Sequence, residues 1–303
     1  MSIKLPEELI FLQNRNVKQK QCHEVMENKV CLISGATSGV GLEALKVLAA
    51  KHAKLVIIAR NEKKALKYQA EIKRQYQVDV DILLADFADL QSVRALASQI
   101  LAKYPKIDVF INSIGVYATK LNYTVDNYEE VFQVNHLAPF LLLNLLIDRF
   151  KKSDTRIILV NSEGHRFNGL NCHDLNWEKR PYMGLRSYGA SKTAQLLTMG
   201  KFKELFNGSK VTINAMHPGE VKTNIGNNNG LLYRWFLHHI TWHFLKEPEI
   251  AGLAIYYLAA SKEMQYVSNR FFNLTIDEKV AKHARNSQKA DKIWDLSCKM
   301  VNL

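Results

Sequence analysis

The sequence contains 303 residues, of which 47% are hydrophobic and 23% are charged, as is usual for a soluble globular protein. A chain of this length suits one large α/β domain or two modest ones. No apolar run reaches the roughly eighteen residues needed to cross a bilayer, and the charged start does not resemble a signal peptide. We therefore expect an intracellular protein that is soluble or attached to a membrane only peripherally.

The formal net charge of +12 is compatible with nucleic acid, an anionic membrane surface or an anionic cofactor as partner. Lysine and arginine are scattered along the chain and no nucleic-acid-binding motif is present. We interpret most of the charge as solvated surface, with attraction to a membrane as the alternative. The four cysteines have neither C-x-x-C spacing nor a histidine at metal-ligand spacing, so we expect reduced thiols and no metal.

Residues 1–28 precede the first predicted strand and combine charged residues with an apolar patch at residues 9–12. We expect a helical extension packed on the domain, with a partner-binding arm as the alternative. The domain itself is expected to begin at Lys29.

From Lys29 onward, short apolar segments rich in β-branched residues alternate with amphipathic segments. Strands are expected at residues 30–34, 55–59, 80–85, 109–112, 157–161 and 211–215, with a last strand at 271–272. Helices are expected at residues 42–52, 62–76, 89–103, 126–151, 185–206 and 278–300. This alternation predicts one α/β domain with a doubly wound parallel sheet of about seven strands and helices on both faces.

A polar, turn-rich loop at residues 224–230 is followed by an aromatic-rich segment at residues 231–245. Residues 231–245 could form an interfacial helix touching a membrane, or belong to a lid over an apolar substrate at about residues 220–247. A helix that covers the core is an equally weighted alternative. The three histidines of this segment are spaced i, i+1, i+5, and no carboxylate or cysteine lies within residues 231–245, so we do not expect them to bind zinc.

A glycine-rich turn follows the first predicted strand, with glycines spaced G-x-x-x-G-x-G before a helical pattern. Glycines let the backbone turn sharply and approach a pyrophosphate, while the new helix presents unpaired N–H groups and its positive dipole end to the phosphates. The turn predicts a dinucleotide site, although glycines also form turns that bind nothing. The expected contacts are Gly35, Thr37, Ser38, Gly39, Val40 and Gly41.

Arg60 lies at the end of the second predicted strand, about twenty residues past the glycine turn. An NAD-selective fold places an acidic residue there, whereas an arginine can bind the 2′-phosphate of NADP bidentately. We therefore expect NADP(H) in preference to NAD(H), with Asn61, Lys63 and Lys64 close to that phosphate. A solvated arginine that opens a helix is the alternative.

Small and polar residues follow the third and fourth predicted strands, at the sheet edge where open α/β folds bind ligands. The Asp86 carboxylate, next to Phe87, is expected to accept a hydrogen bond from the adenine amino group, with helix capping as the alternative. Asn112 and Gly115 are expected to let the backbone pass close to the cofactor ribose, with a plain strand-to-loop turn as the alternative.

Tyr188 and Lys192 are the most informative pair in the sequence. On a helix, residues four apart share one face, so a fixed ammonium lies beside the phenol. A tyrosine normally has a pKa of about 10, and an adjacent cation lowers that pKa. The pair predicts a tunable acid/base, although Tyr-x-x-x-Lys alone is also common on protein surfaces.

Ser162 ends the fifth predicted strand, where its hydroxyl can bind a substrate carbonyl and stabilise the developing oxyanion. Hydrolysis by a Ser-His-Asp triad is a rival, but no G-x-S-x-G elbow surrounds this serine. Asn135 precedes Pro139 by four residues, and its amide could hold a water that passes protons to Lys192. The alternative is an amide that satisfies carbonyls freed by the proline.

These motifs occur in the order seen in the short-chain dehydrogenase/reductases, which the chain resembles over roughly residues 29–300. Segments at 59–61, 174–176, Gln195 and 290–297 resemble the retinol dehydrogenase-like branch. The resemblance implies a single-domain Rossmann fold over residues 29–303, with a substrate lid at about 220–247. Ser34 stands where the family usually has threonine, and Ile114 stands where it has a small residue.

The resemblance also implies roles for the site residues. It makes Tyr188 the acid/base, lets Lys192 lower the pKa of Tyr188 and hold the nicotinamide ribose, has Ser162 orient the carbonyl, and gives Asn135 a proton-relay water. The residues implied to border the nicotinamide are Pro218, Gly219, Val221 and Thr223.

The combined motifs predict an NADP(H)-dependent oxidoreductase that transfers hydride between the nicotinamide and a carbonyl or alcohol carbon. An apolar retinoid-, steroid- or lipid-like aldehyde or ketone would suit residues 231–245, which could also contact a membrane peripherally. The family often forms dimers through helices near 126–150 and 185–206. An epimerase or dehydratase is disfavoured by the glycine spacing and short tail. A catalytically weak NADP(H)-binding regulatory or scaffold protein is the other alternative.

Overall fold

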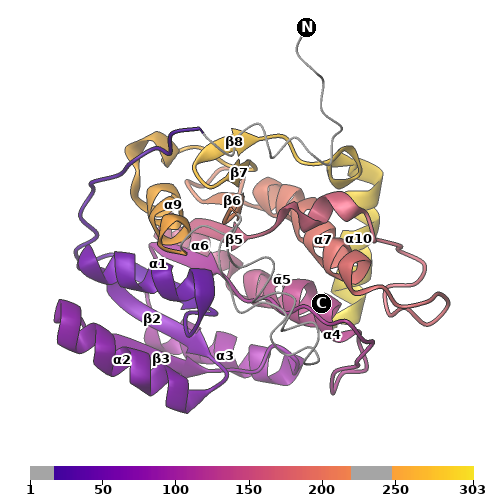
Figure 1. Ribbon diagram of the computed structural model, residues 1–303, viewed down its shortest axis with the longest axis horizontal. Helices are drawn as coiled ribbons and strands as arrows, with labels where there is room; N and C mark the ends of the chain where they lie inside the picture. Colours follow the sequence, from indigo (N-terminus) through magenta and orange to yellow (C-terminus); the bar gives the residue numbers. More distant parts are fainter. Residues whose placement is uncertain (1–16, 220–247) are drawn as a thin grey trace, which may run out of the picture.

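The computed structural model describes residues 17–219 and 248–303. A sheet with the strand order β3-β2-β1-β4-β5-β6-β7-β8 forms the centre of this part of the chain (Figure 1). All neighbouring strands pair in parallel except β7 and β8. The strands are β1 Val30–Ser34, β2 Lys54–Ala59, β3 Val80–Leu84, β4 Val109–Asn112, β5 Arg156–Val160, β6 Thr212–His217, β7 Phe271–Asn273 and β8 Ile276–Glu278.

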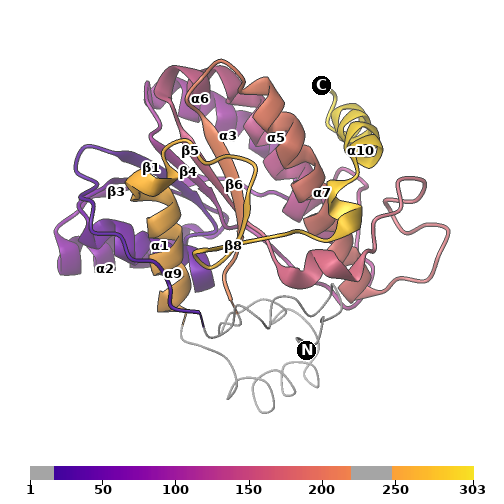
Figure 2. The same cartoon turned by 90° about the horizontal axis from the view of Figure 1, so that it is seen from above.

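Helices cover both faces of the sheet, which confirms the predicted doubly wound architecture (Figure 2). α1, α2 and α9 pack on one face, and α3, α5, α7 and α10 pack on the other. The α-helices are α1 Gly39–Ala50, α2 Glu62–Tyr76, α3 Leu90–Lys103, α4 Glu130–Phe132, α5 Ala138–Leu145, α6 Ile147–Ser153, α7 Gly184–Leu205, α9 Glu249–Ala260 and α10 Ser287–Met300. Single turns are η2 Gln133–Leu137, η3 Glu163–Phe167, η6 Lys262–Met264 and η7 Lys282–Arg285.

Strand β2 shows why continuous apolar segments in the sequence predicted the strands of this sheet. Val56 and Ile58 belong to the core under one helical layer, and Leu55 and Ile57 belong to the core under the other. Successive side chains of a strand point to opposite faces, so a strand covered on both faces needs apolar residues at every position.

The predicted helix at residues 126–151 is wrong in its continuity. The chain forms α4, a π-helical turn η2, α5 and α6 in succession. Pro139 has no N–H to donate to the Asn135 carbonyl in an α-helix, and the backbone is π-helical just before this proline. Asn135 therefore lies in a widened turn rather than in a regular helix.

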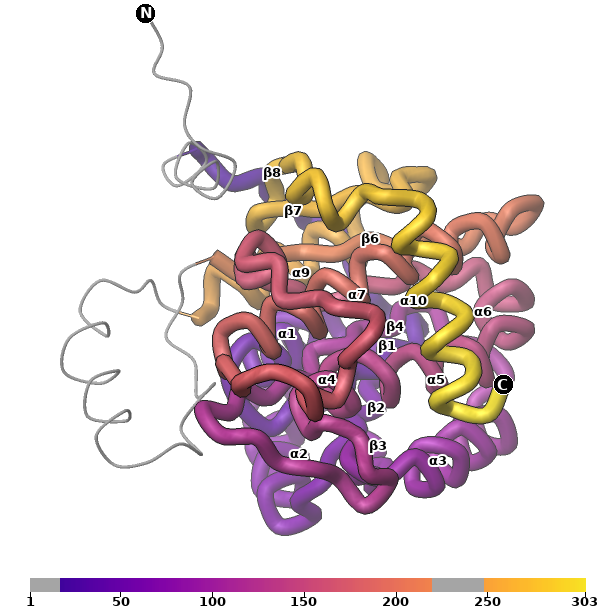
Figure 3. Tube along the Cα trace, turned by 90° about the vertical axis from the view of Figure 1, so that its right-hand side faces the viewer, coloured from indigo at the N-terminus to yellow at the C-terminus, as the bar shows by residue number. Residues whose placement is uncertain are grey.

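The C-terminal segment also differs from the prediction of one helix over residues 278–300. β8 pairs antiparallel with β7 as an additional edge strand, and η7 separates it from α10. Only one of the three β8 residues is apolar, so no hydrophobic run marked it. α10 packs against α7 (Figure 3), where the Trp294 ring contacts Phe140 and Phe202 edge-on with centroids 4.9 Å away in both cases.

The described part of the N-terminal extension, residues 17–28, contains no helix, and the rest of the predicted helical extension lies outside the described residues. Its polar groups bond to the β7–β8 turn instead. The Gln19 side chain accepts hydrogen bonds from the Thr275 N–H (3.0 Å) and hydroxyl (2.7 Å), and the Lys20 N–H donates to the same hydroxyl (2.9 Å). The apolar patch at residues 9–12 and the predicted lid at 220–247 lie outside the described residues.

Among residues 17–219 and 248–303, no single helix has the length and apolarity to cross a bilayer. The segments Glu130–Leu145 and Ile147–Ser153 have that length and apolarity only when taken together, and the chain bends by 61° between them. The same residues contain no group of three or more His, Cys, Asp or Glu side chains placed to hold a metal ion.

Candidate active site

A cleft of about 710 Å³ lies at the carboxyl ends of the parallel strands. It brings together most of the residues singled out in the sequence, from the glycine turn to the Tyr188 helix. The predicted residues that line it are Gly35, Thr37, Ser38, Gly39, Val40, Arg60, Asn61, Lys64, Asp86, Phe87, Gly115, Ser162, Tyr188, Lys192, Pro218 and Gly219. Gly41, Asn112 and Asn135 lie behind this lining, and Val221 and Thr223 fall outside the described residues.

The glycine turn is shaped by close backbone contacts. Gly35 has a φ of +72°, and a β-carbon there would lie 2.8 Å from the Ser113 carbonyl oxygen. A β-carbon at Gly41 would overlap the Gly35 carbonyl oxygen, so Gly41 supports the turn from behind. Ser38 caps α1 without a side-chain hydrogen bond, and the first turn of α1 has no acidic residue. The positive end of α1 is therefore directed at the cleft without an anionic side chain of its own.

Arg60 and Lys64 place two cations at one end of the cleft. The Arg60 side chain is 65% exposed, and its guanidinium lies 4.0 Å from the Asp86 carboxylate. Asn61 is the N-cap of α2 and accepts a hydrogen bond from the Lys64 N–H at 2.9 Å. Arg60 thus precedes the helix and faces the cleft, while Lys63 is exposed and is not part of the cleft lining.

Asp86 does not cap α3, so that alternative for its role is wrong. The N-cap of α3 is Asp89, whose carboxylate accepts from the Gln91 N–H at 2.9 Å. Asp86 accepts from the Ala88 N–H at 2.9 Å and remains in the cleft lining.

Asn112 lies beneath the glycine turn rather than in the cleft lining, where a ribose contact was expected. It is fully buried and stands opposite Ser34 in the β1–β4 register. Its side-chain oxygen accepts from the Ser34 hydroxyl at 2.8 Å, and its Nδ2 has no partner among the described residues. The hydroxyl that Ser34 retains therefore joins the two central strands.

Tyr188, Ser162 and Lys192 converge at the other end of the cleft. Burial raises the pKa of the Tyr188 phenol to about 12, and a hydrogen bond with the Ser162 side chain acts to lower it. The Lys192 ammonium donates to the Val160 carbonyl at 2.9 Å and lies 5.6 Å from the Tyr188 ring centroid. Burial lowers the pKa of Lys192 to about 8. The influence of Lys192 on the pKa of Tyr188 stays a prediction.

Two glycines that the sequence reasoning missed allow Ser162 to approach Tyr188. A β-carbon at Gly164 would lie 2.8 Å from the Tyr188 ring, and one at Gly189 would lie 2.7 Å from the Gly164 carbonyl oxygen. η3 and α7 can therefore pack closely at this point. Both glycines lie within two residues of Ser162 or Tyr188, which is the signal that could have found them.

Asn161 was also missed, although it adjoins Ser162 in the sequence. Its side-chain oxygen accepts from the Ser162 N–H at 2.8 Å, and its amide donates to the Lys192 carbonyl at 3.0 Å and to Gln195 at 2.8 Å. One buried amide thereby joins the end of β5 to α7 and fixes Ser162 relative to the helix that carries Tyr188 and Lys192.

Asn135 holds the loop after β4. Its side-chain oxygen accepts from the Val116 N–H at 2.7 Å, and its amide donates to the Val116 carbonyl at 3.0 Å and to Ser191 at 3.1 Å. A β-carbon at Gly115 would lie 3.7 Å from both the Asn135 oxygen and the Lys192 ammonium. The two groups therefore border the same space next to Gly115.

The cleft wall is partly apolar, because Ile114, Val116 and Val134 contribute to it. The Tyr117 ring also meets the Tyr188 ring edge-on, with centroids 6.0 Å apart. Tyr117 was not singled out in the sequence, and only its position shortly after β4 could have indicated it.

Comparison with known proteins agrees with this geometry. Residues 29–231 match the short chain dehydrogenase family. The chain is 32% identical to retinol dehydrogenase 14 of Homo sapiens over 296 residues, which cover 92% of this chain and 88% of that protein. It is also 32% identical to retinol dehydrogenase 13 of Homo sapiens, over 91% of this chain and 85% of that protein.

Solved structures share the fold. An uncharacterised protein from Mycobacterium paratuberculosis superposes with a TM-score of 0.74 at 25% identity, covering 92% of this chain and 95% of that chain. A short-chain dehydrogenase from Shigella flexneri, solved with NADP, superposes with a TM-score of 0.67 at 20% identity, covering 84% and 99% of the two chains.

Proposed function

The chain belongs to the short-chain dehydrogenase/reductase family, in its retinol dehydrogenase-like branch, and we propose that it is an NADP(H)-dependent oxidoreductase acting on a carbonyl or alcohol. The observation that carries the proposal is the arrangement of one cleft. Ser162, Tyr188 and Lys192 converge at one end, and the glycine turn and Arg60 lie along the rest.

The residues of the cleft fit a nicotinamide dinucleotide. The first turn of α1 has no acidic side chain and can bind the pyrophosphate, and Arg60 and Lys64 can bind a 2′-phosphate. When bound, the cofactor supplies or accepts the hydride at its nicotinamide ring. Pro218 and Gly219 border the cleft after β6, on the side where the nicotinamide would lie.

The protein's own residues handle the oxygen and the proton. The Ser162 hydroxyl orients the substrate oxygen, and the Tyr188 phenol, held protonated by burial, donates its proton to that oxygen during reduction. In oxidation the phenolate accepts the proton, and the positive charge of Lys192 favours that form. Asn135 and Lys192 border the space beside Gly115, where a water could return protons from solvent.

An apolar substrate suits the wall formed by Ile114, Val116 and Val134. The similarity to proteins named retinol dehydrogenases supports a retinoid-like compound, and steroid- or lipid-like aldehydes and ketones belong to the same class. We further propose that residues 231–245 form a lid over the substrate or touch a membrane peripherally, and that the protein forms a homodimer.

Turnover measured as NADPH absorbance against retinoid, steroid and lipid aldehydes and ketones tests the proposal. Wild type should oxidise NADPH with at least one of them, and Tyr188→Phe should lower kcat by about 10²- to 10⁴-fold with little change in NADPH affinity. Tyr104→Phe is the matched control, because it removes a phenol that bonds Asp81 outside the cleft. A wild type that binds NADPH without turnover, or an active Tyr188→Phe, would refute the proposal.

A further inference from the structure

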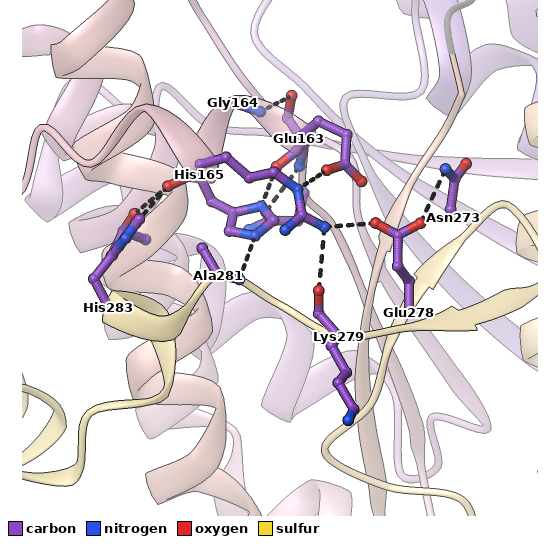
Figure 4. A network of polar contacts seen from close by, with 12 residues as sticks. Glu163, Gly164, His165, Asn273, Glu278, Lys279, Ala281 and His283 are labelled. Atoms are coloured by element: carbon purple, nitrogen blue, oxygen red, sulfur yellow. Dashed lines mark hydrogen bonds and ion pairs between the residues drawn. The ribbon is translucent and has the colours of Figure 1, made fainter. Parts of the chain in front are cut away.

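A buried ionic network lies next to Ser162, between η3 and the β7–β8 hairpin (Figure 4). Arg166 is 5% exposed, and its Nε donates to Glu163. Its Nη2 donates to Glu278 at 2.5 Å and to the Lys279 carbonyl at 3.1 Å. Glu278 also accepts from the Asn273 amide at 3.3 Å. One guanidinium thus joins the turn that follows Ser162 to the C-terminal hairpin.

His165 makes a second connection between the same two segments. Its Nε2 accepts from the Ala281 N–H at 3.1 Å, so this nitrogen carries no proton. The proton is therefore on Nδ1, which donates to the Ser162 carbonyl at 2.7 Å. Burial lowers the pKa of His165 to about 3, consistent with a neutral ring. The His283 Nε2 in turn donates to the His165 carbonyl at 2.8 Å.

The network is costly by the usual rules for buried charge. The carboxyl groups of Glu163 and Glu278 share one guanidinium away from solvent, and removing ionic groups from water is often not repaid by their attraction. Glu163 Oε1, Arg166 Nη1 and His217 Nδ1 are buried without a partner among the described residues. Groups of this kind in a native interior are frequently retained for function rather than for stability.

We propose that Arg166 and His165 are positioning residues for Ser162, which they hold in register with Tyr188 by tying the Ser162 turn to the β7–β8 hairpin. The inference rests on the proposed function, because it assumes that Ser162 orients the substrate oxygen. Neither residue lines the cleft, so both act through Ser162 and not on the substrate. His217 does line the cleft. Burial lowers the pKa of His217, and the nearby positive charge of Arg166 lowers it further.

The effect should appear in kcat rather than in cofactor binding. A displacement of about 1 Å in a catalytic group can cost about 10²-fold in rate. Arg166→Met should therefore lower kcat by about 10- to 100-fold and leave the NADPH dissociation constant within about twofold, because the α1 turn and Arg60 lie elsewhere in the cleft. Arg166→Lys should retain part of the activity, because a lysine keeps the positive charge but cannot donate to Glu163 and Glu278 at once with the geometry of a guanidinium.

A double-mutant cycle with Ser162→Ala separates positioning from general damage. If Arg166 acts through Ser162, Arg166→Met should have almost no further effect on kcat once the Ser162 hydroxyl is absent. Arg149→Met is the matched control, since Arg149 ties α6 to the Leu101 carbonyl (3.0 Å) outside the cleft and should leave kcat unchanged. Glu278→Gln, which keeps an acceptor for Arg166, provides a milder member of the cycle if Arg166→Met does not fold.

If the wild type is active and the losses of kcat in Arg166→Met and Ser162→Ala multiply in the double variant, this inference is overturned while the proposed function stands. A loss of kcat in Arg149→Met equal to that in Arg166→Met would also overturn it. A wild type that turns over no carbonyl would instead overturn the proposed function, and the inference with it.

Discussion

Replacing Arg60 with alanine should weaken NADPH binding by about 10- to 30-fold and change NADH binding by less than about twofold. The reason is that the two cofactors differ only in the 2′-phosphate, and Arg60 is the cation that precedes α2 at the cleft. Asp86, whose carboxylate lies 4.0 Å from the guanidinium, is part of the same end of the cleft.

The magnitude follows from the exposure of the side chain. A hydrogen bond to a charged group contributes about 1.5–3 kcal/mol, which corresponds to roughly 12- to 140-fold in a dissociation constant. Arg60 is 65% exposed, so water and salt screen it and the lower part of that range applies. The loss should be larger at low ionic strength. Lys64→Ala should lower NADPH affinity in the same direction by a smaller factor.

Isothermal titration calorimetry with NADPH and with NADH measures both affinities on one preparation. Lys63→Ala is the matched control, because Lys63 is an exposed neighbour in sequence that does not line the cleft. If Arg60→Ala weakened NADPH binding and NADH binding equally, or left NADPH binding unchanged, Arg60 would not recognise the 2′-phosphate.

Three further predictions concern the glycine turn, helix α7 and the buried network. Gly41→Ala should weaken nucleotide binding, measured by calorimetry, by at least about tenfold, since its β-carbon would overlap the Gly35 carbonyl oxygen; an unchanged nucleotide affinity would contradict this account of the turn. Gly200→Ala on α7 would place a β-carbon 3.9 Å or more from its neighbours, so it should raise the free energy of unfolding, followed by thermal melting, by up to about 1 kcal/mol. Burial and the Glu278 carboxylate raise the pKa of Glu163 from 4.5 to about 7, so the folded protein keeps a proton that the unfolded chain has already lost. Stability should therefore fall by up to about 3 kcal/mol as the pH rises from about 4.5 to about 7. Glu163→Gln should reduce the difference between the free energies of unfolding that urea denaturation gives at about pH 5 and about pH 8. An unchanged difference would show that other groups cause the pH dependence.

The parallel strands could be predicted to within about two residues because runs such as Leu55–Ala59 are apolar on both faces and bounded by turn residues. β8 could not, since its Ile-Asp-Glu sequence has no strand signature. The π-turn at Asn135 depends on a proline four residues later, and an amphipathic pattern alone does not distinguish it from a regular helix.

The candidate site also contains residues that the sequence predicted and contacts that it did not. The residues on strand ends and on one face of α7 were predictable, because their spacing along the chain fixes their place in the fold. The contacts that hold Ser162 were not. Arg166 and Glu278 are separated by 112 positions, and nothing in either local sequence indicates the other.

The central claim is that a hydride passes between the nicotinamide and the carbonyl carbon of a substrate held beside Tyr188. NADPH labelled with deuterium at C4, prepared in each of its two stereochemical forms, tests this directly when incubated with the protein and a retinoid aldehyde. One of the two forms should place deuterium on the former carbonyl carbon of the alcohol, as detected by mass spectrometry, and Tyr188→Phe should give little or no product. Alcohol without deuterium from either form would contradict the proposed reaction.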